Sequence, residues 1–266
     1  MLVGAVTGYL AMDATGSTWV GVLAAIGAGT AAAAVHAFFA VALKVNQIIS
    51  GLGVTIAGTG LAAIMGRSVV GKPPEATFGE LEIPVLGDIP GLGRILFDHH
   101  ALVLVGYAVV PLVWLVLMRT RLGLHLRAAG ENPAAADAMG VRVTAYRFGA
   151  VLFGGAMAGL AGATLSLAES PGWIENMTAG RGWIALALVI FAVWHPLLAL
   201  AGAYFFGCLD VLAFRAQIIG VDIQSTILGM IPYVATFVVL ILVTVLGLRR
   251  RLGAPQALGE PYIRGG

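Results

Sequence analysis

The chain has 266 residues, of which 59% are apolar and only 11% are charged, whereas a soluble domain has about 25% charged residues. This composition excludes a soluble globular protein and indicates an integral membrane protein. The net charge is +2, the single cysteine, Cys208, excludes a disulfide within the chain, and we expect no nucleic-acid partner.

Apolar runs predict an all-α, polytopic helix bundle with about eight membrane segments. The segments cover residues 1 to 12, 19 to 43, 47 to 65, 99 to 118, 145 to 168, 183 to 194, 197 to 212 and 226 to 248. The first is too short to cross a bilayer, so we expect the chain to begin inside a helix whose start is missing. Two others are short and are interrupted at Pro196, in the sequence WHP. Residues 1–248 are predicted to form the membrane domain and residues 249–266 a cytoplasmic tail.

The distribution of basic residues predicts the orientation. If the arginines at 249–251 are cytoplasmic, alternation of the segments places ten of the 15 basic residues inside and ten of the 13 acidic residues outside. This predicts a cytoplasmic loop at 119–144, an outer loop at 66–98 and two cytoplasmic termini, in the plasma or inner membrane of a cell. Within the segments, Gly4 with Gly8 and Gly155 with Gly159 have the spacing of closely packed membrane helices.

Polar residues open the third segment, where Asn46, Gln47 and Ser50 are followed by Thr55. Uncharged polar side chains inside a membrane bundle either bond across helices or line a polar path. Ser50 with His36 or His195 also leaves open an intramembrane enzyme. The sequence has no zinc-protease motif and no G-x-S-x-G turn, and we expect no metal or cofactor.

The outer loop at 66–98 is rich in proline and glycine, which favours an ordered, extended loop without a long helix. Its sequence GRSVVGKP imitates a phosphate-binding loop, but Pro73 replaces the hydroxyl residue that would bind magnesium. We therefore expect no nucleotide site there. The loop serves either as a docking surface for an outer partner or as a solvated connector.

The sequence RAAGENPAAADAMGV, residues 127 to 141, predicts a short helix in the cytoplasmic loop. Asn132 suits the N-cap, Pro133 the first helical position and Gly140 the left-handed stop, and residues 134–139 between them favour helix. A helix of about two turns is not stable alone, so it must be held by a partner or by its own bundle.

A second outer segment, residues 169–183, combines Glu175, Asn176 and Arg181 with two tryptophans. Trp173 and Trp183 are predicted to be anchors at the membrane surface. Arg181 pairs either with an acidic neighbour or with a carboxylate of a partner.

Six motifs resemble the permease subunits of ATP-binding-cassette (ABC) importers, in the branched-chain amino acid and simple-sugar permease family. They are NQIISGL (46–52), LGDIPGLG (86–93), the segment 119–141, ENMTAGRGWIALA (175–187), WHPL (194–197) and ALGEPY (257–262). The resemblance is strongest to the branch associated with nucleoside uptake and basic-membrane-protein-type lipoproteins. Members of the family are usually longer at the N-terminus.

The resemblance implies a non-enzymatic permease that moves a small polar solute, a nucleoside or a simple sugar. It implies as partners a second permease subunit, cytoplasmic ATP-binding subunits and an extracytoplasmic substrate-binding lipoprotein. A passive solute channel is the alternative within transport. The short helix then couples the permease to the ATPase, through residues Arg127, Glu131, Asn132, Pro133, Ala135, Ala136, Met139 and Gly140. We expect the translocation path at Asn46, Gln47, Ser50 and Thr55, and the lipoprotein contact at Glu175, Asn176 and Arg181.

Overall fold

The computed structural model describes residues 1–81, 99–219 and 254–263, with seven isolated positions between 230 and 245. The helices are α1 (Leu2–Thr15), α2 (Thr18–Ala37) with the π-helical extension η1 (Phe38–Ala42), α3 (Gln47–Gly66), α5 (Ala101–Arg119), α6 (Arg121–Glu131), α7 (Pro133–Ala138), α8 (Val143–Thr164) with the π-helical extension η2 (Leu165–Glu169), α9 (Arg181–Phe191) and α10 (Pro196–Ile218). Two short strands, β1 (Glu80–Leu81) and β2 (His99–His100), pair antiparallel.

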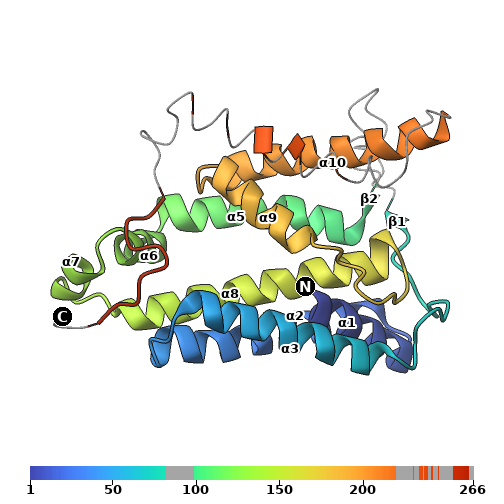
Figure 1. Cartoon of the computed structure of the whole chain (residues 1–266), viewed down its shortest axis with the longest axis horizontal. Coiled ribbons are helices and arrows are strands. Elements are labelled where there is room, and N and C mark those ends of the chain that lie inside the picture. Colours follow the sequence, from blue (N-terminus) through green and yellow to red (C-terminus); the bar gives the residue numbers. More distant parts are fainter. Residues whose placement is uncertain are drawn as a thin grey trace.

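The long helices α2, α3, α5, α8 and α10 lie roughly along one common direction (Figure 1). Helices α1, α2, α3 and α8 form one group, and α5, α9 and α10 lie on the other side of α8. One end of the bundle carries α6, α7 and the tail segment 254–263, and we call it the α7 end. The opposite end carries β1, β2 and the loop from residue 67, and we call it the loop end.

The predicted membrane segments agree in part with the observed helices. Four described helices are long and apolar enough to cross a membrane, over Thr18–Ala42, Gln47–Gly66, Ala101–Arg119 and Val143–Glu169. The helices α1, α9 and α10 match the three remaining predicted segments before residue 220, with shorter apolar stretches at Arg181–Ile190 and Pro196–Leu209. Most of the eighth predicted segment, 226 to 248, lies outside the described residues.

The break between α9 and α10 is confirmed. Val193 and Trp194 have φ angles of +50° and +55°, which no helix accommodates. Helix α10 then begins at Pro196, where the missing N–H costs no hydrogen bond. The proline therefore starts the second helix rather than kinking a continuous one.

Glycines allow α1, α2 and α8 to pack with their backbones in direct contact. A Cβ atom added to Gly4 would lie 2.8 Å from the Gly159 Cα, and one added to Gly159 would collide with the Ala25 carbonyl oxygen. Gly29 of α2 packs in the same way against Gly155. The close approach predicted from the glycine spacing is confirmed, and it brings α1, α2 and α8 into mutual contact.

Replacing Gly159 by alanine should destabilise the protein by about 1–3 kcal/mol, because the added methyl group enters a fully packed contact. The matched control is Gly154→Ala on the same helix, since Gly154 is exposed and has no atom within 4 Å of an added Cβ. In a helix interior that change should be neutral or stabilising by about 0.5–1 kcal/mol. Thermal unfolding of the detergent-purified variants compares them, and equal midpoints would contradict the packing argument.

At the loop end, Trp173 connects the segment that contains it to the end of α3 and to the loop from residue 67. Its side chain is only 1% exposed, and it fills the space beside Gly66, where a Cβ atom would collide with the indole ring. The Gly71 amide donates to the Trp173 carbonyl at 3.4 Å, and the Tyr9 hydroxyl donates to the Lys72 carbonyl at 2.9 Å. The prediction that Trp173 is a surface anchor is therefore wrong, because its ring belongs to the core. Trp183, in contrast, is 64% exposed.

Residues 67–79 contain no helix, as predicted for the start of the outer loop. The Phe78 amide donates to the Leu167 carbonyl at 3.3 Å, and this contact fixes the loop before strand β1. The two strands were not expected from the sequence. Residues 82–98, which include the motif LGDIPGLG, lie outside the described residues.

Candidate functional site

A cavity of about 640 Å³ lies between α2, α3, α8 and the segment 176–186. Glycine, alanine and aliphatic residues form most of its wall. The other described lining residues are Met1, His36, Thr55, Thr59, Asn176, Thr178 and Trp183. No carboxylate, lysine or arginine side chain lines the cavity within the part of the chain that the structure describes. The cavity therefore offers hydrogen bonds and one aromatic surface, with almost no formal charge.

Helix α3 presents its threonines to this cavity. The Thr55 hydroxyl donates to the Gly51 carbonyl at 2.9 Å, and the Thr59 hydroxyl donates to the Thr55 carbonyl at 2.9 Å. A hydroxyl oxygen that donates within its own helix still has lone pairs with which it accepts. Both threonines can thus accept a hydrogen bond from a polar solute.

The predicted path residues divide between two places. Thr55 lies on the cavity wall, and the Ser50 Oγ lies 3.1 Å from the Nδ1 of His36, which also lines it. Asn46 instead caps α3, since its Oδ1 accepts from the amides of Ile48 and Ile49 at 2.9 and 3.2 Å. Gln47 lies at the α7 end, beside the tail. Sequence reasoning missed His36, Thr59 and Thr178 as lining residues and used Trp183 only as an anchor.

The predicted outer residues also separate. Arg181 forms an ion pair with Glu169, with 3.1 Å between Nη1 and Oε1. The acidic neighbour is therefore its partner in this structure. Asn176 has a φ of +56° and lines the cavity, whereas Glu175 is exposed.

The predicted short helix is present at the α7 end, where it begins at Pro133 as expected and ends at Ala138, one residue before the expected end. Asn132 Oδ1 accepts from the Ala135 amide at 3.0 Å, Pro133 is the first helical residue, and Gly140 has a φ of +83°. Each of these three assignments is confirmed. The residues before Asn132 form a further helix, α6, which begins with a Thr120 cap that accepts from the Gly123 amide at 3.2 Å. Thr120 was the signal that could have located this helix.

Helix α7 has an inner face and an exposed face. Ala136 is 5% exposed and packs with Ala129 and Val143, so it supports the helix from within. Met139 is 85% exposed, and Ala135 is also exposed. Arg127 and Glu131 are exposed on α6. The end of the bundle thus presents a short helix with an exposed methionine at its end, together with two exposed charged side chains on α6.

The family described as the permease component of the branched-chain amino acid transport system matches residues 1–247. The chain is 40% identical to the putative glucose ABC transporter permease protein TsgC13 of Haloferax volcanii, over 99% of this chain and 87% of that protein. It is 34% identical to the guanosine ABC transporter permease protein NupQ of Bacillus subtilis and 35% identical to the nucleoside ABC transporter permease protein NupC of Lactococcus lactis. These two alignments cover 93% and 92% of this chain, and 78% of each relative. No solved structure matches the chain.

These matches decide between the transport and enzyme hypotheses. Ser50 and His36 do come within hydrogen-bond distance, as an intramembrane enzyme would require. However, relatives over nearly the full chain are permeases, so the pair is a polar link between α2 and α3 and the chain is not itself an enzyme. By its sequence relatives and its helical membrane architecture, the chain belongs to the family of ABC transporter permease components.

Proposed function

We propose that this chain is the permease subunit of an ABC importer, and that the solute passes through the cavity between α2, α3, α8 and residues 176–186. The observation that carries this proposal is the pairing of an uncharged polar cavity with an exposed α7. A solute path and a docking helix are the two parts that an energised permease needs in one chain. The path residues are then Thr55, Thr59 and Asn176, with Ser50 behind them, and Asn46 and Gln47 belong to the entrance at the α7 end.

The solute class follows from the chemistry of the cavity wall. Moving a charged group into a cavity without a paired charge costs several kcal/mol, whereas an uncharged polar solute needs only hydrogen bonds. Threonine, asparagine and histidine side chains supply these bonds, and the exposed Trp183 ring can stack on a sugar or a base. We therefore propose a nucleoside or a simple sugar, which agrees with the glucose, guanosine and nucleoside permeases among the relatives.

The partners follow from the two ends of the bundle. We propose that α7, with Arg127, Glu131 and Met139 around its tip, rests in a groove of a cytoplasmic ATP-binding subunit. Its exposed apolar tip and the distribution of basic residues support this orientation, which places the tail 249–266 in the cytoplasm. The same arrangement argues against a passive channel, because a channel has no need of a docking helix. The proposed cytoplasmic location applies to the C-terminal tail only, because Met1 lies on the wall of the cavity.

A second permease subunit and an outer lipoprotein complete the proposed importer. This chain is 40% identical to TsgC13 and 32% identical to the glucose ABC transporter permease protein TsgB13, two permeases of one organism. That pair supports a second permease chain here. Glu175 and Asn176 are exposed at the loop end, Asn176 at the cavity edge, and Arg181 is half-buried; these three residues are the proposed contact for the substrate-binding lipoprotein.

A competition assay tests the solute class. Cells expressing this chain with its ATP-binding, second permease and lipoprotein partners should accumulate labelled guanosine or labelled glucose. Excess unlabelled nucleoside or hexose should abolish uptake of the matching label, and excess leucine should leave it unchanged, because no carboxylate, lysine or arginine side chain lines the described part of the cavity to pair with a zwitterion. Uptake of leucine in place of both other solutes would contradict the proposal.

A further inference from the structure

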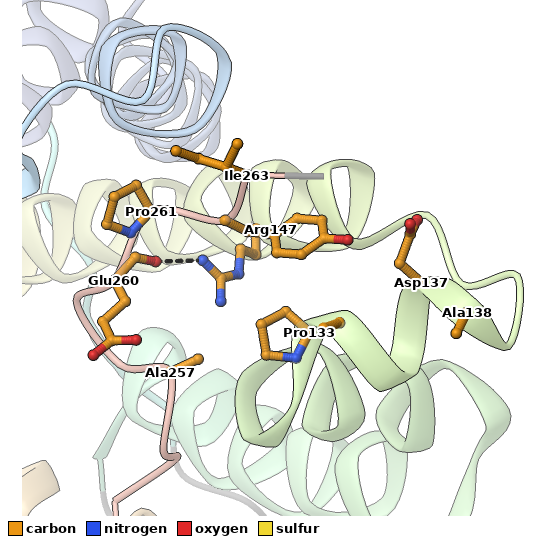
Figure 2. A pocket seen from close by; sticks show the side chains of 10 residues that line it. Pro133, Asp137, Ala138, Arg147, Ala257, Glu260, Pro261 and Ile263 are labelled. Atoms are coloured by element: carbon orange, nitrogen blue, oxygen red, sulfur yellow. Dashed lines mark hydrogen bonds between the residues drawn. The ribbon is translucent and has the colours of Figure 1, made fainter. Parts of the chain in front are cut away.

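Arg147 connects three segments at the α7 end that are far apart in the sequence. It lies near the start of α8 and is half-buried. Its Nη1 donates to the Glu260 carbonyl at 2.6 Å, and its Nη2 donates to the Ala129 carbonyl at 3.3 Å. One side chain thus joins α8, the last turn of α6 and the tail. Figure 2 shows the guanidinium reaching from α8 into the space between the tail and Pro133 of α7.

The tail also holds α6 directly. The Ala257 amide donates to the Gly130 carbonyl at 3.0 Å, and a Cβ atom added to Gly130 would lie 3.3 Å from Pro255. Tyr262 packs on the cluster formed by Ala129, Ala136 and Val143. Between this segment and α7 lies a groove of about 510 Å³. Residues 255–262 therefore lie against α6, α7 and α8 rather than extending away from them.

An arginine suits this position for a chemical reason. The carbonyls in the last turn of a helix lack partners within the helix, and Ala129 is one of them. A guanidinium donates in two directions from one plane, so it satisfies this carbonyl and that of Glu260 together. A lysine ammonium concentrates its charge at one point and does not reproduce this fork.

Helix α8 leads from this junction to the cavity. Gly155 and Ala158 of the same helix form part of the cavity wall. Tyr146, next to Arg147, makes a further link to α6, with its hydroxyl 2.7 Å from the His125 Nδ1. A shift of α6 and α7 is thus connected through one rigid helix to the wall that the solute contacts.

We propose that Arg147, together with the tail segment 254–263, braces α6 and α7 against α8 and so transmits movement of α7 to the solute cavity. Arg147 is a positioning residue in this scheme, because it touches neither the solute nor the ATPase. The inference rests on the proposed role of α7 as the helix that docks on the ATP-binding subunit. The tail then serves the coupling machinery, although it lies outside the membrane.

The test compares Arg147→Gln, Arg147→Lys and Arg142→Gln in the complete reconstituted importer. Arg142 is an exposed arginine at the start of the same helix, so its replacement controls for loss of charge. Arg147→Gln should lower the number of solute molecules moved per ATP by about tenfold, as expected for lost hydrogen bonds to a charged group. Arg147→Lys should lie between this variant and the wild type, and Arg142→Gln should match the wild type. Co-purification of the subunits should be unchanged in all three.

A truncation before residue 254 provides a second measurement, should Arg147→Gln fail to fold. It removes the Glu260 carbonyl without touching α8, and it should lower the same ratio. If Arg147→Gln and the truncation both keep a normal number of solute molecules moved per ATP, while Met139→Glu lowers it, the proposed role of Arg147 and the tail is overturned. The proposed role of α7 is then unaffected. A normal ratio in the Met139 variant as well would refute the proposed role of α7 itself. Poor subunit assembly with a normal ratio would make Arg147 merely structural and would also overturn the inference.

Discussion

Replacing Met139 by glutamate should uncouple ATP hydrolysis from solute transport. Met139 is 85% exposed at the end of α7, directly after a helix whose inner face is already packed. If this tip enters an apolar groove of the ATPase, a carboxylate there loses its hydration without gaining a partner charge, which costs several kcal/mol. Each 1.4 kcal/mol is about a tenfold change in binding. Transport by the reconstituted complex should therefore fall at least about tenfold, while ATP hydrolysis no longer responds to the loaded lipoprotein.

Met139→Leu is the matched control, because it keeps an apolar side chain of similar size, and exchanges of this kind are usually tolerated. It should retain most of the coupled transport. Glu131→Lys, at the exposed end of α6, should give a smaller loss that shrinks at high salt, as expected for a rim ion pair. Normal transport in Met139→Glu, with the protein inserted in the membrane, would refute the docking role of α7.

The features predicted correctly depend on neighbouring residues. Asn132, Pro133 and Gly140 define a helix through their own backbone and side-chain preferences, so the sequence located α7 to within one residue. The contact of Gly4 with Gly159 follows from a spacing within each helix and a general rule of membrane packing. The break before Pro196 is local in the same sense.

The features that were missed depend on contacts between distant residues. A tryptophan near a membrane surface and one in a core look alike in sequence, and only the contact of Trp173 with Gly66 decides between them. Ser50 had two candidate histidines, and the way α2 lies against α3 selected His36. The tail offered no apolar pattern of its own, since its position depends on the Gly130 carbonyl and on Arg147.

The four predicted path residues include one feature set by neighbouring residues and one set by contacts between distant residues. Asn46, Gln47, Ser50 and Thr55 lie on one short stretch, yet only Thr55 lines the cavity. Asn46 is used locally as a cap, as its position before a helix allows. A helix of 1.5 Å rise per residue separates Asn46 from Thr55 by about 14 Å along the axis. One polar cluster therefore extends from the end of the bundle to the middle of a span.

Replacing Thr55 by phenylalanine should block solute uptake. Thr55 is exposed on the cavity wall, so a larger side chain extends into the cavity instead of displacing a packed neighbour. The ring would occupy space that a nucleoside or hexose needs and would remove the hydroxyl acceptor. Uptake should fall at least about tenfold, the effect of some 1.4 kcal/mol or more on solute passage. Insertion and ATPase assembly should be normal, because α7 lies at the far end of the bundle.

Two further variants separate the loss of space from the loss of the hydrogen bond. Thr55→Val keeps the shape and removes the hydroxyl, so it should reduce apparent solute affinity about fivefold, as expected for one neutral hydrogen bond of about 1 kcal/mol. Ala57→Phe adds the same ring to an exposed position of α3 that does not line the cavity, and uptake should stay near the wild-type rate. If Ala57→Phe blocks uptake and Thr55→Phe does not, the solute passes along another face of α3. Equal loss in both would instead indicate that α3 tolerates no added volume, and the cavity would lose its assignment as the path.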